Sequence, residues 1–552
     1  MSTPPNAVTP PMPGAPMGTG AAVPAGTGSA AAPTQIPWLG LAAVLLGTFI
    51  STVNTRLSTF GLADIRGAVH AGFDEGAWIT TAQAIAQMLV APIAIWMGGV
   101  LGSRRVLLEA ALAFAVVSFL EPFSPNLQML LGLQFMGGLA SGFFVPLTLS
   151  FVLRNMPPKV WAYGIAIYAL NLEVSLNISA SLEGWYADNA SWRWIFWQNV
   201  PLALGMAACI HYGIKPQAPN PQRPRADIFG LASAGLGFAL IYAALDQGNR
   251  LDWVNSPLVW GLMLAGLWLL AAFFLHARHS PTSGFDLKVV FTAPLPRLLL
   301  LIAFLRLTLL STAYIVPQFL QVVRGFRALE VGQTLFWIAA PQLVLCLMAG
   351  MLLRRSDARL VASIGFLFIC IASLMVAHNI TPVWGSDQFL PSQLLQAVGQ
   401  SLALSGTLFF AILHLRPEDA LTFGAATQIT RLMGGEIGQA FIVTFVRIRG
   451  QIASNVIGQH VQSGDGQTLQ RIQAYGAATA RAGDPASAFT RGAALLGNAV
   501  RSAALTQAII DALVILAAAT AVTLLVIVTR RAAPQGPASH VPLIGRRPVK
   551  PT

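Results

Sequence analysis

The sequence predicts an all-α polytopic membrane protein, and three observations support this fold class. Of the 552 residues, 55% are hydrophobic and only 10% are charged, whereas a soluble domain has about 25% charged residues. The mean hydropathy is +0.64. Gly and Pro, with 50 and 35 residues, are spread along the whole chain. This composition excludes a soluble multidomain protein, a disordered protein and a secreted disulfide scaffold.

Apolar stretches define the predicted elements. A helix that spans a membrane needs about 20 mostly apolar residues, and fourteen stretches qualify. They lie near 37–61, 77–100, 106–121, 127–152, 160–183, 194–213, 228–245, 256–275, 297–320, 330–352, 360–378, 390–413, 422–446 and 505–529. The third stretch is short and glycines interrupt the seventh, so twelve or thirteen spans are the alternative. The only long loop that we expect between spans is 447–504.

Both ends of the chain are expected to be flexible tails. Residues 1–36 are rich in Pro, Gly, Ala, Ser and Thr and contain no Lys or Arg. A signal peptide, in contrast, needs a basic start before its apolar core. Residues 531–552 are a second Pro-rich segment. The membrane domain is therefore expected between these two tails.

The positions of Lys and Arg account for the formal net charge of +12. With a cytoplasmic N-terminus, 19 of the 33 Lys and Arg fall on inner connections and tails and 5 on short outer loops, while 6 lie in the long loop and 3 in spans. Cytoplasmic loops of membrane proteins carry an excess of basic residues. The charges therefore predict that both termini are cytoplasmic. They argue against a nucleic-acid partner, because no basic patch interleaved with aromatic residues is present.

One segment carries a specific family resemblance. Residues 192–201 read WRWIFWQNVP, which resembles the start of helix 6 in the 14-helix drug:proton antiporter branch of the major facilitator superfamily, the EmrB/QacA type. The motif residues are Trp192, Arg193, Trp194, Asn199 and Pro201. Further segments are similar to family motifs at helix 2, at the end of helix 9 and in helix 13; they are 72–80, 317–333 and 431–438. The resemblance runs from about residue 40 to residue 530.

The resemblance implies the major facilitator fold. It places one six-helix bundle at 37–214, two extra central helices at 215–290, and a second six-helix bundle at 291–530 with a long periplasmic loop at 447–504. It also implies a secondary active transporter of a bacterial inner membrane, which alternates access around a central cavity. The implied activity is proton-coupled efflux of small amphipathic or aromatic compounds. EmrB-type pumps of two-membrane bacteria further imply a periplasmic adaptor and an outer-membrane channel as partners.

Several positions depart from the family pattern, and they leave the coupling scheme open. In the loop between helices 2 and 3, Gly102, Arg104 and Arg105 match the family's gating motif, but uncharged residues stand at 99–100, where the family has charges. Uncharged residues also replace the family's Asp in helix 1, its Arg in helix 4 and its Gly-Pro in helix 5. These residues are Asn54, Gln134, Ser179 and Ala180.

Polar residues in the fifth span are the first candidates for a transport site. An ionisable residue inside a span is costly, so each is a functional candidate. Glu173, Asn177 and Ser181 recur every four residues and form one polar stripe. A second stripe consists of Asn171, Ser175, Ser179 and Glu183. Two interpretations remain, a hydrogen-bonded seam between helices or a cavity in which Glu173 exchanges protons.

Three arginines lie within spans, namely Arg56, Arg306 and Arg431. Arg431 shares its span with Glu436, but their five-residue spacing does not make an i, i+4 pair. A buried cation therefore needs a partner from another helix. For Arg306 and Arg431 the alternatives are a structural salt bridge between the bundles and a substrate-linked or proton-linked switch. Arg56, beside Asn54, would either snorkel outward or attract an anionic group.

Two weaker patterns concern packing and a pocket. Gly138 with Gly142, and Gly434 with Gly438, have the GxxxG spacing that allows close helix packing. A looser set would line a pocket for an amphipathic ligand, although core packing explains it as well. It consists of Gln318, Gln321, Gln333, Phe336, Trp337 and Gln342.

The sequence contains no catalytic constellation, so we predict that the protein is not an enzyme. It has no Gly-Lys phosphate loop, no H-E-x-x-H and no G-x-S-x-G. His276 and His279 are the closest histidine pair and are expected to have no acidic or Cys companion, so we expect no metal site and no cofactor. Cys209, Cys346 and Cys370 lie in apolar stretches, which argues against a disulfide. The energy for transport is expected to come from an ion gradient.

The sequence leaves two alternatives to proton-coupled efflux. An organic-anion transporter would use the three span arginines. A transport-inactive membrane scaffold or sensor would explain the departures from the family motifs. The lipid bilayer is a partner in every case, a small-molecule substrate in the two transport cases, and protons in the efflux case.

Overall fold

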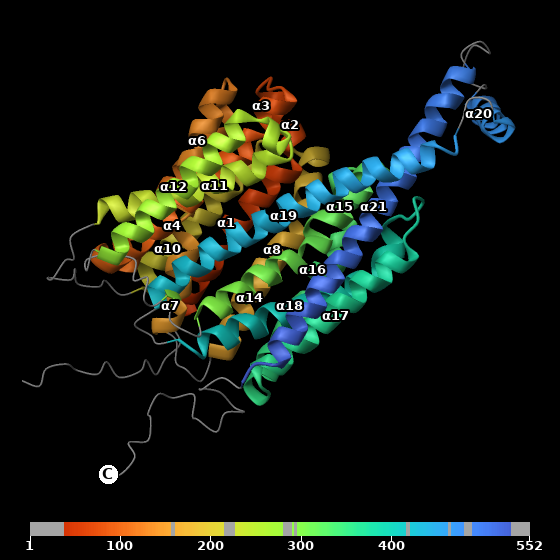
Figure 1. Cartoon of the computed structure of the whole chain (residues 1–552). Coiled ribbons are helices and arrows are strands. Elements are labelled where there is room, and N and C mark those ends of the chain that lie inside the picture. Colours follow the sequence, from red (N-terminus) through yellow and green to blue (C-terminus); the bar gives the residue numbers. More distant parts are fainter. Residues whose placement is uncertain are drawn as a thin grey trace, which may run out of the picture.

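The computed structural model of the protein describes residues 38–155, 161–214, 227–279, 290–291, 295–415, 420–461, 465–479 and 488–531. Every regular element in these ranges is helical (Figure 1). The expected tails, 1–36 and 531–552, lie outside the described ranges except for Arg531.

The helices fall into an N-terminal half, a linker hairpin and a C-terminal half. The N-terminal half comprises α1 (Trp38–Phe60), α2 (Leu62–Ala68), α3 (Phe73–Gly76), α4 (Trp78–Met97), η1 (Gly98–Gly102), α5 (Ser103–Leu120), η2 (Glu121–Phe123), α6 (Leu127–Ser141), α7 (Phe144–Asn155), α8 (Trp161–Asn189), α9 (Trp194–Trp197) and α10 (Asn199–Gly213). The linker hairpin comprises α11 (Ile228–Gly248), η4 (Trp253–Asn255) and α12 (Pro257–His279). The C-terminal half comprises α14 (Leu295–Thr308), η5 (Ser311–Ile315), α15 (Val316–Gln318), η6 (Phe319–Val323), α16 (Ala328–Arg355), α17 (Ala358–Asn379), α18 (Ser386–Ile412), α19 (Ala420–Gly458), α20 (Gly466–Thr479) and α21 (Ala488–Val528).

Twelve helical segments among the described residues are long and apolar enough to cross a membrane. One of them, Phe73–Phe123, contains both α4 and α5. These helices meet at Gly102, whose φ of 85° suits a residue without a Cβ. A further stretch, α10, has only 15 residues. The all-helical membrane architecture is confirmed, and the count of fourteen spans stays a prediction.

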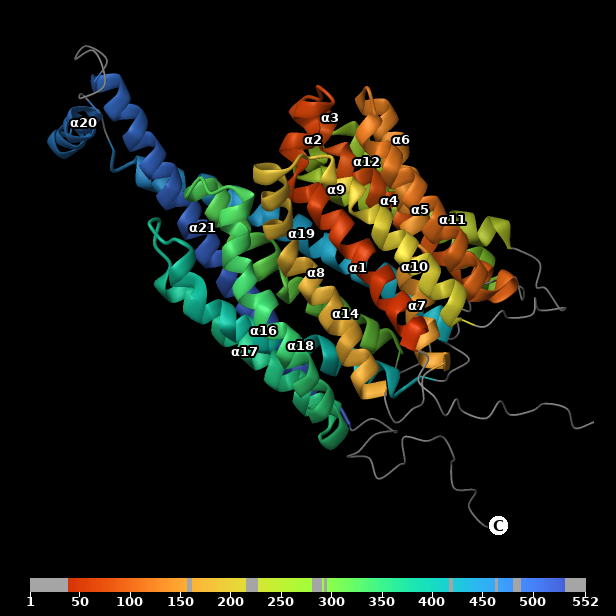
Figure 2. The ribbon, with the colours of Figure 1, turned by 180° about the vertical axis from the view of Figure 1, so that it is seen from behind.

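The segment 447–504, which we expected to be a long loop between spans, is helical over most of its described residues. Where it is described, it consists of the end of α19, all of α20 and the start of α21. Ala, Leu, Gln and Arg, which favour helices, are common in it. Helix α20 also packs closely on α21, because a side chain at Gly492 would overlap Ile472. Figures 1 and 2 show α20 and the adjoining end of α21 projecting from the rest of the molecule.

Both GxxxG pairs make the close helix contacts that the sequence predicts. A Cβ on Gly142 would lie 3.1 Å from the Cα of Gln87, so α6 packs tightly on α4. A Cβ on Gly434 would lie 2.9 Å from the Cα of Ala303, so α19 packs tightly on α14. Small residues allow such approach of two backbones.

The N- and C-terminal halves meet along α8 and α16. A side chain at Gly184 would overlap Leu329, and one at Gly332 would overlap the backbone of Ser181. At one end of the molecule, which we name the packed end, a Cβ on Gly98 would lie 3.3 Å from Leu421 of the other half. Helix α1 begins at this end and α21 ends there. The opposite end holds a cavity and is named the vestibule end.

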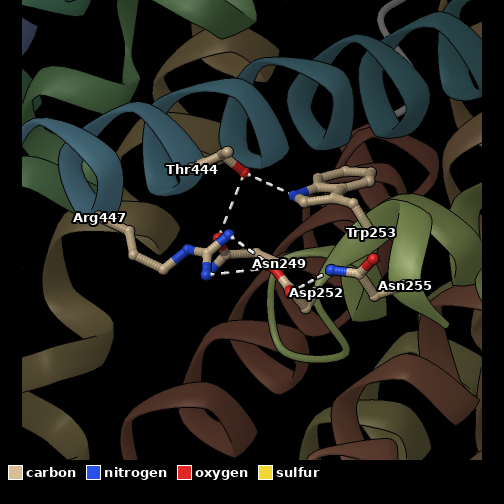
Figure 3. Close-up of polar contacts among 6 residues, drawn as sticks. All are labelled: Asn249, Asp252, Trp253, Asn255, Thr444 and Arg447. Atoms are coloured by element: carbon tan, nitrogen blue, oxygen red, sulfur yellow. Dashed lines mark hydrogen bonds and ion pairs between the residues drawn. The ribbon is translucent and has the colours of Figure 1, made fainter.

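The linker hairpin lies against both halves. Helix α11 packs on α4, where a Cβ on Gly235 would lie 2.5 Å from the Leu89 carbonyl oxygen. The turn between α11 and α12 contacts α19 at the vestibule end (Figure 3). The hairpin therefore bridges an N-terminal and a C-terminal helix.

Candidate functional site

The ninth predicted span is one helical segment, Leu295–Val323, but it is not a regular α-helix throughout. Helix α14 ends at Thr308, and two π-helical turns, η5 and η6, follow around Pro317. Such turns free backbone groups and are frequent at functional sites. Here η5 presents Ser311 and Thr312 to the interior, where both are buried.

A buried polar network surrounds Glu173 on α8. Its Oε2 accepts a hydrogen bond from Gln342 Nε2 on α16 at 3.2 Å. Asn177 Nδ2, one turn on, donates to Gln342 Oε1 at 3.3 Å and to Gln400 Oε1 on α18 at 3.2 Å. Glu173 and Gln342 are fully buried, with 0% exposure. The network therefore joins helices of both halves.

The same network continues to the π-helical turn. Gln400 Nε2 donates to Thr312 Oγ1 at 2.8 Å, and Gln396 Nε2 donates to Ser311 Oγ at 3.2 Å. We name the whole set the central amide cluster; it consists of Glu173, Asn177, Ser311, Thr312, Gln342, Gln396 and Gln400. Within the described ranges no cation forms an ion pair with Glu173, and its Oε1 has no hydrogen-bond partner. A carboxyl group held by neutral amides can take up and release a proton without breaking a salt bridge.

Three residues of this cluster are candidates from the sequence. They are Glu173, Asn177 and Gln342, and the structure brings them together. Gln396 and Gln400 were missed, although two amides four residues apart inside a span are a readable signal. The second stripe serves another contact, because Asn171 Nδ2 donates to the Leu45 carbonyl of α1 at 2.6 Å.

A cavity of about 870 Å³ opens between the halves at the vestibule end. Gln318 and Gln321 line it, as the pocket prediction requires. Phe336 and Trp337, from the same predicted set, are exposed on the outer surface instead. The ionisable residues in its lining are Arg56, Asp64, Arg66, Glu183, Asp188 and Arg327. Three cations and three acids suit ligands with polar groups of either sign.

Arg56 connects the halves at the floor of this vestibule. Its Nη2 donates to the Ala313 carbonyl of η5 at 2.9 Å, and its guanidinium lies 5.0 Å from the ring centroid of Phe60. Asn54, two residues earlier on α1, accepts a hydrogen bond from Asn199 Nδ2 at 2.6 Å. The two candidates in α1 therefore differ, because Arg56 faces the other half and Asn54 holds α10.

Arg306 and Arg431 lack ion pairs within the described part of the chain. Arg431 Nη2 donates to Gln428 Oε1 at 3.0 Å on its own helix. Arg306 lies beside Gly435, and its Nε is buried without a hydrogen-bond partner. Glu436 pairs with neither arginine and lies beside Tyr242 of α11. The described residues thus provide no salt bridge between the halves at these positions.

The family-motif segment forms the turn between α8 and α10. Arg193 lies over the ring of Trp192, with 5.6 Å to its centroid, and Trp194 stacks on Tyr186 at 6.3 Å. Pro201 is exposed in the first turn of α10, whereas Asn199 is buried. Trp and Tyr at a helix end suit a membrane interface.

The gating-loop candidates hold neighbouring elements. Gly102 makes the turn into α5, and Arg104 Nη2 donates to the His211 carbonyl at the end of α10 at 2.9 Å. Arg105 is exposed and pairs with Glu109 at 2.7 Å. Arg104 therefore joins α5 to α10 at the packed end, while Arg105 pairs on its own helix.

One expectation about the histidines was wrong. His276 does have an acidic companion, since its Nε2 lies 2.9 Å from Asp227 Oδ1. Asp227 also caps α11 by accepting from the Gly230 amide at 2.9 Å. The contact closes the hairpin at the packed end. Among the described residues, no group of three His, Cys, Asp or Glu side chains is arranged to hold a metal ion.

The fold and site define a class, that of polytopic helical membrane transporters with a buried polar site between two halves. The profile of the Major Facilitator Superfamily matches residues 44–439. The chain belongs to the Major Facilitator Superfamily, and it is a membrane transporter, not an enzyme.

Curated relatives and solved structures agree with this assignment. The multidrug export protein EmrB of Escherichia coli K12 is 22% identical over 402 residues, which cover 73% of this chain and 78% of EmrB. The fatty acid resistance protein FarB of Neisseria gonorrhoeae is 21% identical over 424 residues, 75% of this chain and 82% of FarB. The crystal structure of the human organic anion transporter MFSD10 has 14% identity and a TM-score of 0.55, covering 89% of this chain and 100% of that one. This last likeness shows the fold.

Proposed function

We propose that the protein is a secondary active transporter that exports small amphipathic or aromatic compounds in exchange for protons. The central amide cluster carries this proposal. It places one carboxyl group, which has no ion pair among the described residues, where four helical elements of both halves meet. Multidrug export by the EmrB relatives supports the substrate class.

Alternating access is supported by the difference between the two ends. The vestibule leads inward from one end, whereas apolar residues of both halves pack together at the other. We place the packed end in the cytoplasm, because Arg104, Arg354 and Arg359 lie near it and cytoplasmic loops are rich in basic residues. Both described chain ends then face the cytoplasm, with α4, α5 and α10 crossing separately in a fourteen-span topology.

We also propose the domain division and the setting that the resemblance implies. The two halves act as six-helix bundles, with the linker hairpin between them, in a bacterial inner membrane. A periplasmic adaptor and an outer-membrane channel complete the pathway. Cross-linking in cells followed by purification should recover a neighbouring adaptor, and its absence would count against this partnership.

Transport in proteoliposomes tests the function. With an imposed pH gradient, the wild-type protein should move ethidium, an amphipathic aromatic dye, and the flux should vanish when the gradient is collapsed. Glu173→Gln should abolish gradient-driven flux, since the amide cannot take up a proton. The matched control is Glu109→Gln, which removes an exposed carboxyl from α5. If neither ethidium nor a panel of aromatic compounds moves, a transport-inactive scaffold becomes the better interpretation.

An organic anion is a second candidate substrate, favoured by the absence of ion-pair partners for Arg306 and Arg431 in the described ranges. Carboxyfluorescein is a suitable probe for this reading. Its binding should weaken in Arg306→Ala and in Arg431→Ala. Unchanged binding in both variants would exclude the anion reading.

A further inference from the structure

A second polar site lies between α4, α11 and α19, away from the central amide cluster. Asp246, in the last turn of α11, accepts a hydrogen bond at Oδ2 from the Thr81 hydroxyl of α4. Gln247 Nε2 donates to Thr81 Oγ1 at 2.6 Å and to Asp246 Oδ2 at 3.2 Å. Asp246 is thus held by neutral donors of two helices.

Glu436 of α19 lies on the other side of this site. It is only 6% exposed, and its carboxyl group lies near Asp246 and beside the Tyr242 hydroxyl of α11. We name Thr81, Tyr242, Asp246, Gln247 and Glu436 the hairpin joint. It contains two acids, on two different helices, that approach each other across a tyrosine.

Two cations lie near the joint. Arg250 lies near Asp246, but its hydrogen bonds go to Gln247 Oε1 and to Asp74 Oδ1, both at 2.8 Å. Arg306 of α14 lies near Tyr242. On α19, Arg447 pairs with Asp252. The remaining charged residues of the packed elements lie elsewhere, on α19 at Arg431 and Arg449 and in the last turn of α12 at His276, Arg278 and His279.

Helix α4 contributes no charge at all, since its sequence from Trp78 to Met97 contains none. Two carboxylates close together in a medium of low polarity repel each other strongly when no cation separates them. The lower-energy state keeps one proton on the pair, as in other close carboxyl pairs. The joint therefore has the composition of a proton-binding site.

The joint also lies within reach of the aqueous phase. Asp246 is two residues from the end of α11, and Arg250, one turn further, contacts Asp74, whose side chain is 79% exposed. Tyr242 lies one turn deeper, about 6 Å along the helix. A proton that arrives from the vestibule end meets Asp246 first and Glu436 second.

The turn between α11 and α12, residues 249–256, which we name the hairpin tip, contacts α19 next to this site. Trp253 Nε1 donates to Thr444 Oγ1 at 2.9 Å, and Thr444 donates to Asn249 Oδ1 at 3.3 Å (Figure 3). Arg447 contacts Asp252 at 3.3 Å in the same view. The end of α11 is therefore fixed to α19, while Asp246 holds α4 through Thr81.

From this geometry we infer that Asp246 and Glu436 are a proton-binding pair, through which the linker hairpin couples protonation to the contact between α4 and α19. This inference rests on the proposed function for its role in transport, but not for the binding of the proton. The ionised Asp246 accepts the Thr81 hydrogen. When Asp246 takes up a proton, it loses its negative charge and holds Thr81 more weakly, so α4 can separate from the hairpin.

Infrared difference spectroscopy of the purified full-length protein, titrated with acid, tests the pair without any substrate. Protonated carboxyl groups give a separate carbonyl band, and each variant removes its own contribution. In a Glu173→Gln background, Asp246→Asn and Glu436→Gln should each remove or shift a titrating band. The matched controls, Asp387→Asn and Glu109→Gln, change exposed acids and should leave that band in place.

Thr81→Val serves as a second variant that keeps both acids. It removes a donor that stabilises ionised Asp246, so the midpoint of the band should move to higher pH. If the spectra of Asp246→Asn, Glu436→Gln and Thr81→Val all match the controls, the pair binds no proton and the inference fails, whatever the flux shows. If the bands behave as expected but no compound moves in vesicles, the proposed function fails and the proton site stands.

Discussion

The central amide cluster and the hairpin joint both hold buried acids, but they hold them differently. Glu173 is 0% exposed and is surrounded by amides from both halves. Asp246 lies near a helix end, within a chain of contacts that reaches the exposed Asp74. A sealed acid can exchange protons only when the halves move, whereas an acid near the surface can exchange them first. The difference suggests that the two sites have different roles. Protons would enter at the hairpin joint, and the substrate would compete with protons at the central amide cluster.

The largest expected effect comes from pushing α8 and α16 apart near the vestibule end. Gly332→Ala places a methyl group on the backbone of Ser181, and overlap of this kind costs about 1–3 kcal/mol or more. We expect a lower melting temperature and loss of transport. Thermal unfolding in detergent and flux in vesicles measure both. Gly497→Ala, where a Cβ meets nothing within 4 Å, is the control and should leave both unchanged.

A smaller effect should follow from removing one amide of the central cluster. Gln342→Leu deletes the donor to Glu173 and an acceptor of Asn177, leaving buried polar groups unpaired at a cost of about 1–3 kcal/mol. Transport should be lost, while the infrared titration of Asp246 and Glu436 should persist. The exposed Gln333, on the same helix, supplies the control Gln333→Leu. A change of the joint titration in Gln342→Leu would show that the two sites are one unit.

The features of the fold and of the candidate site that the sequence predicts are those that depend on residues close together in the chain. Span positions follow from runs of apolar residues, and the glycine contacts follow from four-residue spacing, so the sequence predicts both. Glu173 bonds to Gln342, 169 positions away in the chain, and Asn177 bonds to Gln400, 223 positions away. No spacing rule connects residues so far apart in the sequence.

Two misses have specific causes. The seventh apolar stretch was expected to end near 245, one residue before Asp246. In the structure α11 continues to Gly248, since Thr81 and Gln247 supply hydrogen bonds to that carboxyl group. The helices in 447–504 were missed because only apolar stretches were expected to be helical. This segment is not apolar, but a residue's helix propensity does not require hydrophobicity.

The hairpin tip offers a weaker test of the same comparison. Thr444→Val removes the acceptor of the Trp253 indole, which should cost about 0.5–1.5 kcal/mol. We expect faster hydrogen exchange in the 249–256 segment and slower transport, with the central cluster unaffected. Thr529→Val, at an exposed site on the end of α21, is the control. Equal exchange in both variants would mean that α19 does not hold the tip.

The smallest expected effect concerns the pH range in which the tip stays attached. Hydrogen bonds from Asn255 and from Arg447 lower the pKa of Asp252 below the ordinary aspartate value of 3.8. A carboxyl group whose pKa is lowered by folding contributes stability above its unfolded pKa, and that contribution is lost only as the pH falls through the folded pKa. Between pH 7 and pH 5 the tip should therefore remain on α19. Fluorotryptophan NMR can follow this, with the Trp253 resonance assigned by its absence in Trp253→Phe. A shift of that resonance between pH 7 and pH 5 that disappears in Asp252→Asn would contradict the prediction. If instead the shift disappears only in Asp246→Asn, the tip is reporting protonation of the hairpin joint, and the two sites on the hairpin would be directly coupled.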